Sequence, residues 1–347
     1  MKNHLLIKSP DLVLNTLNRL KFLLIAMVLI SSCKKDSTDE TKTTPVTNPT
    51  PADSAEWSQT NYSYPDAGVC HTLVSKGNTL YAGTDDGMFI SSDTGATWLA
   101  RNASTPAALC QAIIFVGNTI FAGKDDEVIT STDDGVTWTI VSSGLPSNDA
   151  VHVLLHNGSR LFCGFYGSGV YVSSNNGVTW VPANIGLTNM NVNGLVNIGT
   201  TVFASTSSGG IFKSTNNGAS WIKVSTASIG LWNVTMRAIG SKVFVGSYNG
   251  MFVTSDEGAT WTDIGAGINH PTPGLGLLTV DGTDLYFLLG SGGSNKVYVT
   301  RDNGVTWTYI TPKPPGIAGL SVFTTVVNQG YLFAGTNTDG VWKFGKL

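Results

Sequence analysis

Charge is scarce in this sequence, and what there is provides no surface suited to polyanions. Only 12% of the 347 residues are Asp, Glu, Lys or Arg, and the formal net charge is −3. Residues 1–32 hold four basic side chains and one acidic side chain, so the rest of the chain carries a net charge near −6. Nucleic acids and anionic membrane surfaces require clustered Lys and Arg. We therefore expect no nucleic-acid partner.

Motifs that carry catalysis are also missing. The sequence contains no nucleophile elbow for a Ser-His-Asp triad, no zinc-ligand spacing and no phosphate-binding loop. We therefore assign no catalytic residue, no metal site and no cofactor.

Cysteine is rare as well. Beyond Cys33 there are three cysteines, and an odd number permits at most one disulfide in an oxidising compartment. Two of them occupy repeat positions that hold valine elsewhere, which favours buried apolar side chains, although the pairing stays open. The three are Cys70, Cys110 and Cys163.

The apolar run at residues 22–30 is too short to cross a bilayer. It follows Arg19 and Lys21, in the order typical of an export signal. We expect residues 1–32 to be a signal peptide outside the fold. Residues 33–54 are rich in Thr, Pro and charge, cannot form a core, and are expected to be a disordered tether.

The apolar run is followed by the sequence SSC, and LISSC resembles the lipobox of bacterial lipoproteins, where the cysteine is acylated after cleavage. The resemblance implies that Cys33 becomes the first residue of an exported outer-membrane lipoprotein. Such a protein would be held at the membrane by its lipid anchor and would face the periplasm or the cell exterior. The alternative is a cleaved soluble protein with an incidental cysteine.

Glycine and tryptophan are abundant, with 40 and 9 copies. Six tryptophans end copies of one motif, and short apolar runs separated by Gly- or Asn-containing turns precede each copy. We call these copies W-turns: SSDTGATW (91–98), STDDGVTW (131–138), SSNNGVTW (173–180), STNNGASW (214–221), TSDEGATW (254–261) and TRDNGVTW (300–307). Their regular spacing predicts a repeat protein with four short strands per unit.

The W-turns resemble the Asp-box (BNR) repeat, S/T-x-D/N-x-G-x-x-W, and the resemblance covers nearly everything from Trp57 to the C-terminus. It implies the fold of sialidases, xyloglucan-active endoglucanases, the sortilin luminal domain and a photosystem II assembly factor. We expect residues 55–347 to be all-β, a single seven-bladed β-propeller of four-stranded antiparallel blades, and a monomer. Because such proteins share a fold and not a function, the resemblance leaves the activity open.

The seventh blade is predicted to combine both ends of the propeller. Residues 322–344 supply three strands, and EWSQTN at 56–61 matches ATWLARN around Trp98. An N-terminal strand would then complete the last blade and pair an edge that would otherwise be exposed.

The polar residue in the middle of each W-turn is expected to support the fold. Asp or Asn can accept N–H bonds within the turn, Gly tolerates a positive φ, and Trp packs between neighbouring sheets. A metal site or a catalytic acid would need the negative charge throughout, whereas two of the six residues are amides: Asp93, Asp133, Asn175, Asn216, Asp256 and Asp302.

The face opposite the W-turns is the expected binding face, because the longer connections gather there. Aligned early positions of the innermost strands predict a polar ring near a channel mouth: His71, Gln111, His152, Asn193, Thr235, Gly276 and Phe323. Aromatic residues fall in the same loops, and we select Tyr166, Trp232 and Tyr248 as ligand-binding; the others are Tyr62, Tyr64, Phe165 and His270. A hydrated channel alone would also favour polar residues, and aromatic rings can simply pack loops.

Acidic residues also gather on that face: Asp85, Asp86, Asp125, Asp126, Glu127 and Asp149. Paired carboxylates can hydrolyse a glycoside when their spacing and pKa values suit the reaction. Solvated turn residues are the alternative interpretation.

An exo-sialidase-like glycoside hydrolase is the enzyme alternative. The resemblance implies three arginines that clamp a substrate carboxylate, but only four arginines follow Cys33, at repeat positions that do not converge: Arg101, Arg160, Arg237 and Arg301. The Arg-Ile-Pro signature of sialidases and the two-propeller length of the endoglucanases are absent. We therefore predict a non-catalytic, envelope-anchored propeller that binds a glycan or protein partner or supports an assembly.

Overall fold

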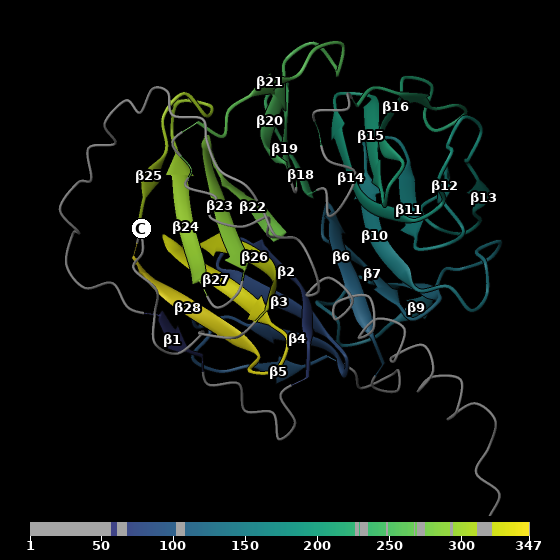
Figure 1. Ribbon diagram of the computed structural model, residues 1–347. Helices are drawn as coiled ribbons and strands as arrows, with labels where there is room; N and C mark the ends of the chain where they lie inside the picture. Colours follow the sequence, from purple (N-terminus) through teal and green to yellow (C-terminus); the bar gives the residue numbers. More distant parts are fainter. Residues whose placement is uncertain are drawn as a thin grey trace, which may run out of the picture. The chain divides into compact units, whose positions relative to one another are not determined.

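The computed structural model describes residues 57–60, 68–101, 108–225, 229, 235–247, 249–266, 268, 275–291, 294–310 and 321–346 (Figure 1). Within these residues the chain forms strands and no helix. The strands make seven antiparallel sheets of four, arranged as the blades of a seven-bladed β-propeller. The predicted fold class is confirmed.

Each blade contributes one strand to each of four positions. The innermost strands are β2 (Cys70–Lys76), β6 (Cys110–Val116), β10 (Val151–His156), β14 (Val192–Ile198), β18 (Thr235–Ile239), β22 (Leu275–Asp281) and β26 (Val322–Asn328). The second strands are β3 (Thr79–Thr84), β7 (Thr119–Lys124), β11 (Leu161–Phe165), β15 (Thr201–Thr206), β19 (Lys242–Ser247), β23 (Asp284–Ser291) and β27 (Tyr331–Thr336).

The outer half of each blade is shorter. The third strands are β4 (Gly87–Ser91), β8 (Glu127–Ser131), β12 (Val170–Ser173), β16 (Gly210–Ser214), β20 (Gly250–Thr254), β24 (Ser294–Thr300) and β28 (Val341–Lys346). The outermost strands are β5 (Leu99–Ala100), β9 (Thr139–Ile140), β13 (Val181–Pro182), β17 (Ile222–Lys223), β21 (Thr262–Asp263), β25 (Thr308–Tyr309) and β1 (Trp57–Gln59). Blades 1 to 6 run in chain order from β2 to β25, and blade 7 contains β26, β27, β28 and β1.

The two ends of the propeller chain meet in blade 7. Trp57 of β1 pairs with Phe344 of β28, and Gln59 pairs with Trp342. Figure 1 shows the purple β1 beside the yellow β28. Innermost strands of successive blades contact one another, and β26 contacts β2, so the ring closes. The predicted closure by an N-terminal strand is confirmed for Trp57–Gln59; Glu56 and Asn61 lie outside the described residues.

The hydrophobic core lies between neighbouring blades. Each core cluster joins side chains of two successive sheets; for example, Leu80 and Phe89 of blade 1 pack with Phe333 and Val341 of blade 7. An aromatic ring recurs at the same place in the second strand of every blade and is buried there: Tyr81, Phe121, Phe162, Phe203, Phe244, Tyr286 and Phe333. Burial of such rings supplies much of the stability of a propeller.

The blades pack so closely that side chains must be small at particular points. A Cβ added at Gly123 of β7 would lie 2.3 Å from Cγ1 of Val151 in the next blade, so no larger residue fits without movement. Cys70 and Cys110 occupy the position of Val151 in their own blades and are buried. The three cysteines of the described chain are free thiols, and burial raises the pKa of Cys110 to about 12. They are therefore inert core residues.

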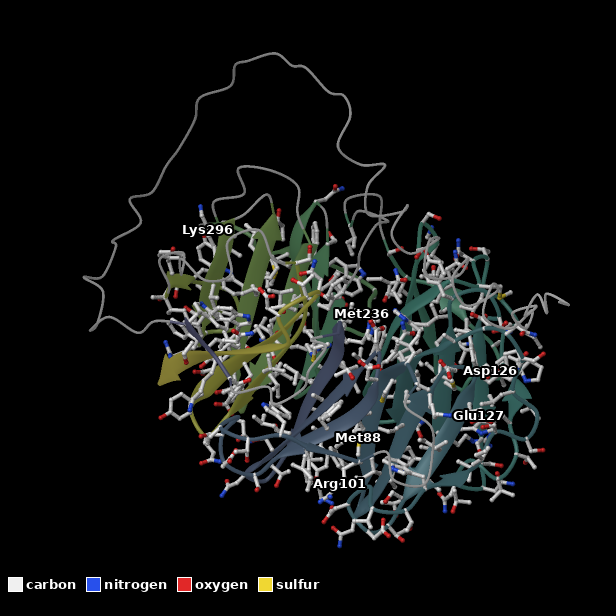
Figure 2. The ribbon with its side chains drawn as sticks, turned by 90° about the horizontal axis from the view of Figure 1, so that it is seen from below. Met88, Arg101, Asp126, Glu127, Met236 and Lys296 are labelled. Atoms are coloured by element: carbon white, nitrogen blue, oxygen red, sulfur yellow. The ribbon has the colours of Figure 1, made fainter. Side chains whose placement is uncertain are left out.

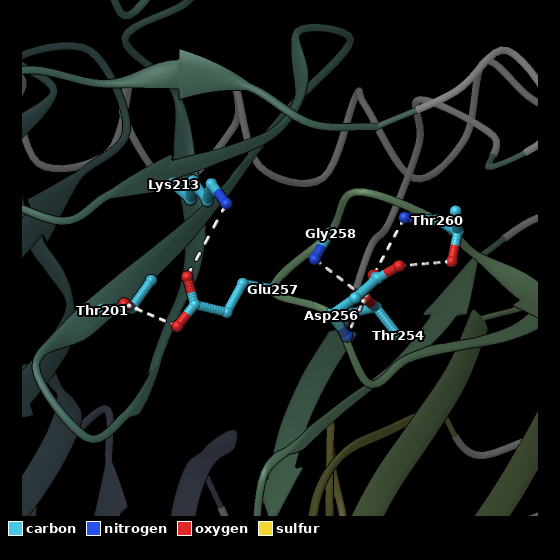
Figure 3. A network of polar contacts seen from close by, with 7 residues as sticks. All are labelled: Thr201, Lys213, Thr254, Asp256, Glu257, Gly258 and Thr260. Atoms are coloured by element: carbon cyan, nitrogen blue, oxygen red, sulfur yellow. Dashed lines mark hydrogen bonds and ion pairs between the residues drawn. The ribbon is translucent and has the colours of Figure 1, made fainter.

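Each W-turn is held by the same hydrogen bonds around its Asp or Asn. In blade 5, Thr260 donates its N–H to Oδ1 of Asp256 (2.9 Å) and its hydroxyl to Oδ2 (2.6 Å), while Thr254 donates its hydroxyl to Oδ1 (2.7 Å) (Figure 3). Gly258 N–H then donates to Thr254 Oγ1 (2.8 Å). These are the bonds that a turn-stabilising carboxylate makes.

An amide makes the same turn. In blade 4, Ser220 N–H donates to Oδ1 of Asn216 (2.9 Å), and the amide Nδ2 of Asn216 donates to the Ser220 hydroxyl (2.9 Å). Blade 3 repeats this arrangement around Asn175. Negative charge is therefore not needed to form a W-turn.

The W-turns also join successive blades. The indole N–H of each W-turn Trp donates to the end of the outermost strand of the preceding blade, as Trp221 Nε1 does to the carbonyl of Ala183 (2.8 Å). Glu257 of blade 5 reaches Lys213 and Thr201 of blade 4, at 3.7 Å and 3.3 Å (Figure 3). Blade 7 departs from this pattern, because the buried Nε1 atoms of Trp57 and Trp342 have no partner among the described residues.

Candidate functional site

Five innermost strands begin with the same irregularity. In β2, Cys70 pairs with Thr84 and Thr72 pairs with Gly83, so His71 is an extra residue with no residue opposite it. The registers of β6, β10, β14 and β26 shift at the same place. Such β-bulges re-aim a side chain. We call the five extra residues the bulge residues: His71, Gln111, His152, Asn193 and Phe323.

The bulge residues lie at the end of the propeller opposite the W-turns, which we call the loop face; it also carries the turns between second and third strands. Blades 7, 1, 2, 3 and 4 are consecutive around the ring, so the bulges form one arc. Four residues selected from the sequence as ligand-binding belong to it. Their side chains stem from the part of each strand where the backbone departs from regular pairing.

Two positions of the predicted ring are not bulge residues. Thr235 pairs with Gly246 in regular register, as Thr72 does with Gly83, so it corresponds to the residue after a bulge. Gly276 pairs with Leu289 in a strand without a register shift and is not a bulge residue either. Thr235 therefore lies one residue further along its repeat than the bulge position, whereas β22 lacks the shift itself, which an alignment of sequences does not reveal.

Each bulge residue is followed, fourteen positions later, by a turn residue of its own blade, and three of the five pairs are in contact. His71 Nε2 lies 2.9 Å from Asp85 Oδ1. Ser207 donates its hydroxyl to Asn193 Oδ1 (3.0 Å). The ring of Tyr166 meets that of His152 edge-on, with centroids 6.3 Å apart. The fixed spacing is a sequence signal that would have identified Ser207, which sequence reasoning missed.

The loop face also carries aromatic contacts between blades. Phe323 of blade 7 is 44% exposed, and its ring centroid lies 6.3 Å from that of His71 in blade 1. Phe165, grouped with the loop aromatics from the sequence, is instead a fully buried end of β11 that packs on Tyr171. Trp232, Tyr248, Tyr62, Tyr64, His270 and Cys33 lie outside the described residues.

His152 and Asp149 leave polar atoms unpaired. His152 Nδ1 and Asp149 Oδ2 are buried atoms without a hydrogen-bond partner in the described structure. Burial, with a smaller contribution from His71, lowers the pKa of His152 to about 4, and the Asp149 carboxylate opposes the shift. His152 is therefore neutral at neutral pH.

Two further acidic residues of the loop face, Asp126 and Glu127, have polar groups close to their carboxylates. Asp126 Oδ2 accepts the N–H of Asn148 (2.9 Å), and Lys124 Nζ lies 3.8 Å from Glu127 Oε2. Figure 2 shows Asp126 and Glu127 close together at the turn between β7 and β8. Among the described residues, no three or more His, Cys, Asp or Glu side chains lie together in a way that could hold a metal ion.

The arginines are dispersed. Arg101 Nε donates to the carbonyl of Asp134 in a W-turn (3.1 Å), and Arg301 Nε lies 2.9 Å from Asp284 Oδ2 in blade 6. Arg237 of β18 donates to the carbonyl of Met236, and Arg160 lies in the turn before β11. In Figure 2, Arg101 lies beside Met88, apart from Met236 and from the acidic pair. These positions do not form a clamp for one carboxylate.

Seven four-stranded blades and an arc of bulges on the loop face define a seven-bladed β-propeller with a candidate binding face. A family model described as the DUF6242 beta propeller domain matches residues 33–160. No curated protein matches the chain. Among the described residues there is no helix of the length and apolarity needed to cross a membrane.

Several solved structures share the fold. A GH74 enzyme of Niastella koreensis matches with TM-score 0.60 and 18% identity, over 80% of this chain and 43% of that chain. The extracellular domain of the putative one component system BT4673 from B. thetaiotaomicron matches with TM-score 0.64 and 13% identity, over 83% of this chain and 39% of that chain. YCF48 bound to D1 peptide matches with TM-score 0.64 and 12% identity, over 86% of this chain and 99% of that chain.

These likenesses show the fold alone, because every identity is below 20%. The chain spans less than half of the GH74 enzyme and of the BT4673 domain, whereas it matches YCF48 over nearly its whole length. The neighbours include an enzyme, an extracellular domain and a protein solved with a bound peptide. The fold is therefore compatible with either role.

Proposed function

We propose that this chain is a non-catalytic propeller, anchored in the cell envelope, whose loop face binds a glycan or protein partner or supports an assembly. The observation that carries the proposal is the arc of five bulges. They share one backbone irregularity but hold two imidazoles, two amides and one phenyl ring. A small number of convergent polar groups beside aromatic surface is typical of a binding site.

The comparisons support a binding role in general terms. YCF48 was solved with a peptide bound, and the BT4673 domain is extracellular. In this proposal, residues 1–32 are the signal peptide that directs export, and Cys33 is acylated. Residues 33–54 then separate the membrane from the propeller at residues 55–347. A rigid propeller on a flexible tether suits capture of a partner near a membrane.

Binding at the loop face is tested with the full-length chain and two variants of that face. One combines Gln111→Ala with Asn193→Ala, and the other combines Tyr166→Ala, Trp232→Ala and Tyr248→Ala. The matched control, Ile140→Ala with Ile222→Ala, changes two exposed side chains of outermost strands. Affinity capture from the native envelope and a glycan array are expected to lose signal with both loop-face variants only. Unchanged capture by both would contradict the proposed site.

The lipid anchor has its own test. Cys33→Ser is expected to abolish metabolic labelling with a fatty acid and to move the chain from the detergent phase to the aqueous phase, because the anchor supplies the membrane affinity. Labelling that persists in the variant would place the lipid elsewhere or remove it from the proposal.

A glycoside hydrolase remains the second candidate, because carboxylates are paired at Asp85 and Asp86 and again at Asp125 and Asp126 on the loop face. The test is release of sialic acid or cleavage of oligosaccharides by the purified chain. Activity that disappears in Asp86→Asn or Asp126→Asn would establish catalysis and overturn the binding proposal. Absence of turnover in the wild-type chain and in both variants is the expected result.

A further inference from the structure

The loop face of blades 1 to 3 is strongly acidic. In the described turns and bulges of these blades, one lysine and the imidazole of His71 face six carboxylates; the ammonium lies 3.8 Å from Glu127, and His71 Nε2 lies 2.9 Å from Asp85 Oδ1. The residues are Lys124 against Asp85, Asp86, Asp125, Asp126, Glu127 and Asp149. Most other charged contacts of the structure, such as Lys213 with Glu257, belong to the W-turn end or the outer rim. A face with one sign of charge attracts partners of the opposite sign.

Two buried acceptors within this face lack a donor. Asp149 Oδ2 is a carboxylate oxygen, and His152 is neutral, so its unpaired Nδ1 accepts a hydrogen bond when the proton resides on Nε2. The two residues are three positions apart, and the carboxylate acts electrostatically on the imidazole. Each residue as a whole is only partly buried. Leaving buried acceptors unpaired is costly, and a ligand that donates to both removes that cost.

Charge distinguishes the classes of ligand. Neighbouring hydroxyls of a sugar can donate to two acceptors but are neutral, whereas a lysine ammonium has three N–H donors and an arginine guanidinium has five. Only the basic groups also supply a positive charge that compensates the negative charge of Asp149. Tyr166, edge-on to His152, and the exposed Phe323 ring near His71 offer faces for an aliphatic stem or a cation.

We propose that the partner of the loop face is a polypeptide segment, and that a lysine or arginine side chain of this segment donates to Asp149 and His152. This inference rests on the proposed binding function and narrows it to one partner class. It makes Asp149 the residue that selects for positive charge, while the bulge amides Gln111 and Asn193 belong to blades 2 and 4, on either side of blade 3.

The test begins with the full-length chain and a bead-displayed library of N-acetylated, C-amidated pentapeptides. The library is expected to yield peptides with Lys or Arg at one position. For the best peptide, fluorescence anisotropy then compares it with a neutral analogue, in which acetyl-lysine replaces Lys or citrulline replaces Arg. We expect affinity to fall at least tenfold for the analogue, because a charge-assisted hydrogen bond is lost.

The protein side of the test uses Asp149→Asn, which keeps the shape and removes the charge. The matched control is Asp133→Asn, an identical change in a W-turn, where Asn175 and Asn216 already serve in other blades. Asp149→Asn is expected to weaken the basic peptide at least tenfold and the neutral analogue less than twofold. Asp133→Asn is expected to change neither by more than twofold.

Several results would overturn the inference. Selection of acidic or uncharged peptides would exclude a basic side chain, and equal losses in both variants would exclude Asp149. Binding of glycans or of chitosan oligosaccharides without any basic peptide would overturn the polypeptide partner and leave the binding function intact. A loop face that captures nothing in the library, the array or the envelope would overturn both proposals.

Discussion

The two ends of this propeller use repetition in opposite ways. At the W-turn end, six turns repeat the same side-chain hydrogen bonds, and the central residue varies only between Asp and its amide. At the loop face, five bulges repeat the same backbone geometry, but their side chains belong to four residue types. Side chains are uniform where folding uses them and diverse where the backbone alone makes the structure. The diverse end is therefore the place to look for function.

The largest effect is expected from removing a W-turn tryptophan. Trp221→Ala deletes an indole that is 3% exposed and its hydrogen bond to Ala183. We expect the free energy of unfolding to fall by about 3–5 kcal/mol, as for other buried aromatic side chains. Urea denaturation followed by tryptophan fluorescence and circular dichroism measures it. A loss below about 1 kcal/mol would show that the W-turns do not hold the blades together.

A smaller effect is expected from the central polar residue of a W-turn. Asn216→Ala removes the acceptor of the Ser220 N–H and of the Ser214 hydroxyl. We expect a loss of about 1–2 kcal/mol in the free energy of unfolding. Asn216→Asp is the control and should stay within about 0.5 kcal/mol of wild type, since blade 5 makes the same bonds with Asp256. If Asp costs as much as Ala, the interchange of acid and amide is not neutral.

Acid should act on the four carboxylate W-turns and spare the two amide ones. Donors from Thr97 lower the pKa of Asp93 to about 2, and the corresponding Thr137 and Thr260 do the same for Asp133 and Asp256. At Asp302 burial is the largest single influence and raises the pKa, but the combined donors of Thr306 and Thr300 lower it overall. A carboxylate whose pKa is lower in the folded state stabilises it above pH 4, and this contribution disappears as pH falls towards 2.

The comparison can therefore be made within one protein. Replacing the four W-turn aspartates by Asn should flatten the loss of stability between pH 4 and pH 2, which urea midpoints at several pH values measure. Wild-type chain is the reference. An unchanged slope in the quadruple variant would mean that acid unfolds the propeller through carboxylates elsewhere.

The smallest effect on stability is expected at the loop face. Gln111→Ala removes a bulge side chain for which the described structure shows no hydrogen bond, so the free energy of unfolding should change by no more than about 0.5 kcal/mol. Urea denaturation beside Asn216→Ala provides the contrast. A loss above about 1 kcal/mol would assign Gln111 to folding and would weaken the distinction between the two ends.

The fold was predictable because its signals are local and repeated. The spacing of the W-turns predicted the blades, and the match of Trp57 to Trp98 predicted that β1 completes blade 7. All five bulge residues were also among the seven aligned positions of the innermost strands. The bulges themselves were not predicted, because register depends on pairing with the next strand; this is why the sequence does not show that β22 pairs at Gly276 without a shift.

Other features of the site depend on packing that a linear pattern does not contain. Phe165 has the residue type of an exposed loop aromatic, but it ends β11 with its ring in the core. The unpaired atoms of His152 and Asp149 are defined by the absence of neighbours within the described structure. Only three-dimensional contacts reveal such atoms.

Closure through β1 has a consequence for how the chain can be cut and rejoined. Phe344 and Trp57 pair with each other in blade 7, at the place where the other blades have a W-turn. A six-residue linker with W-turn sequence between them would make the polypeptide backbone continuous around the ring. New termini could then open in a turn of any other blade, and the blade at which the gene begins would become a free design variable, while the cyclic order of the blades stays the same.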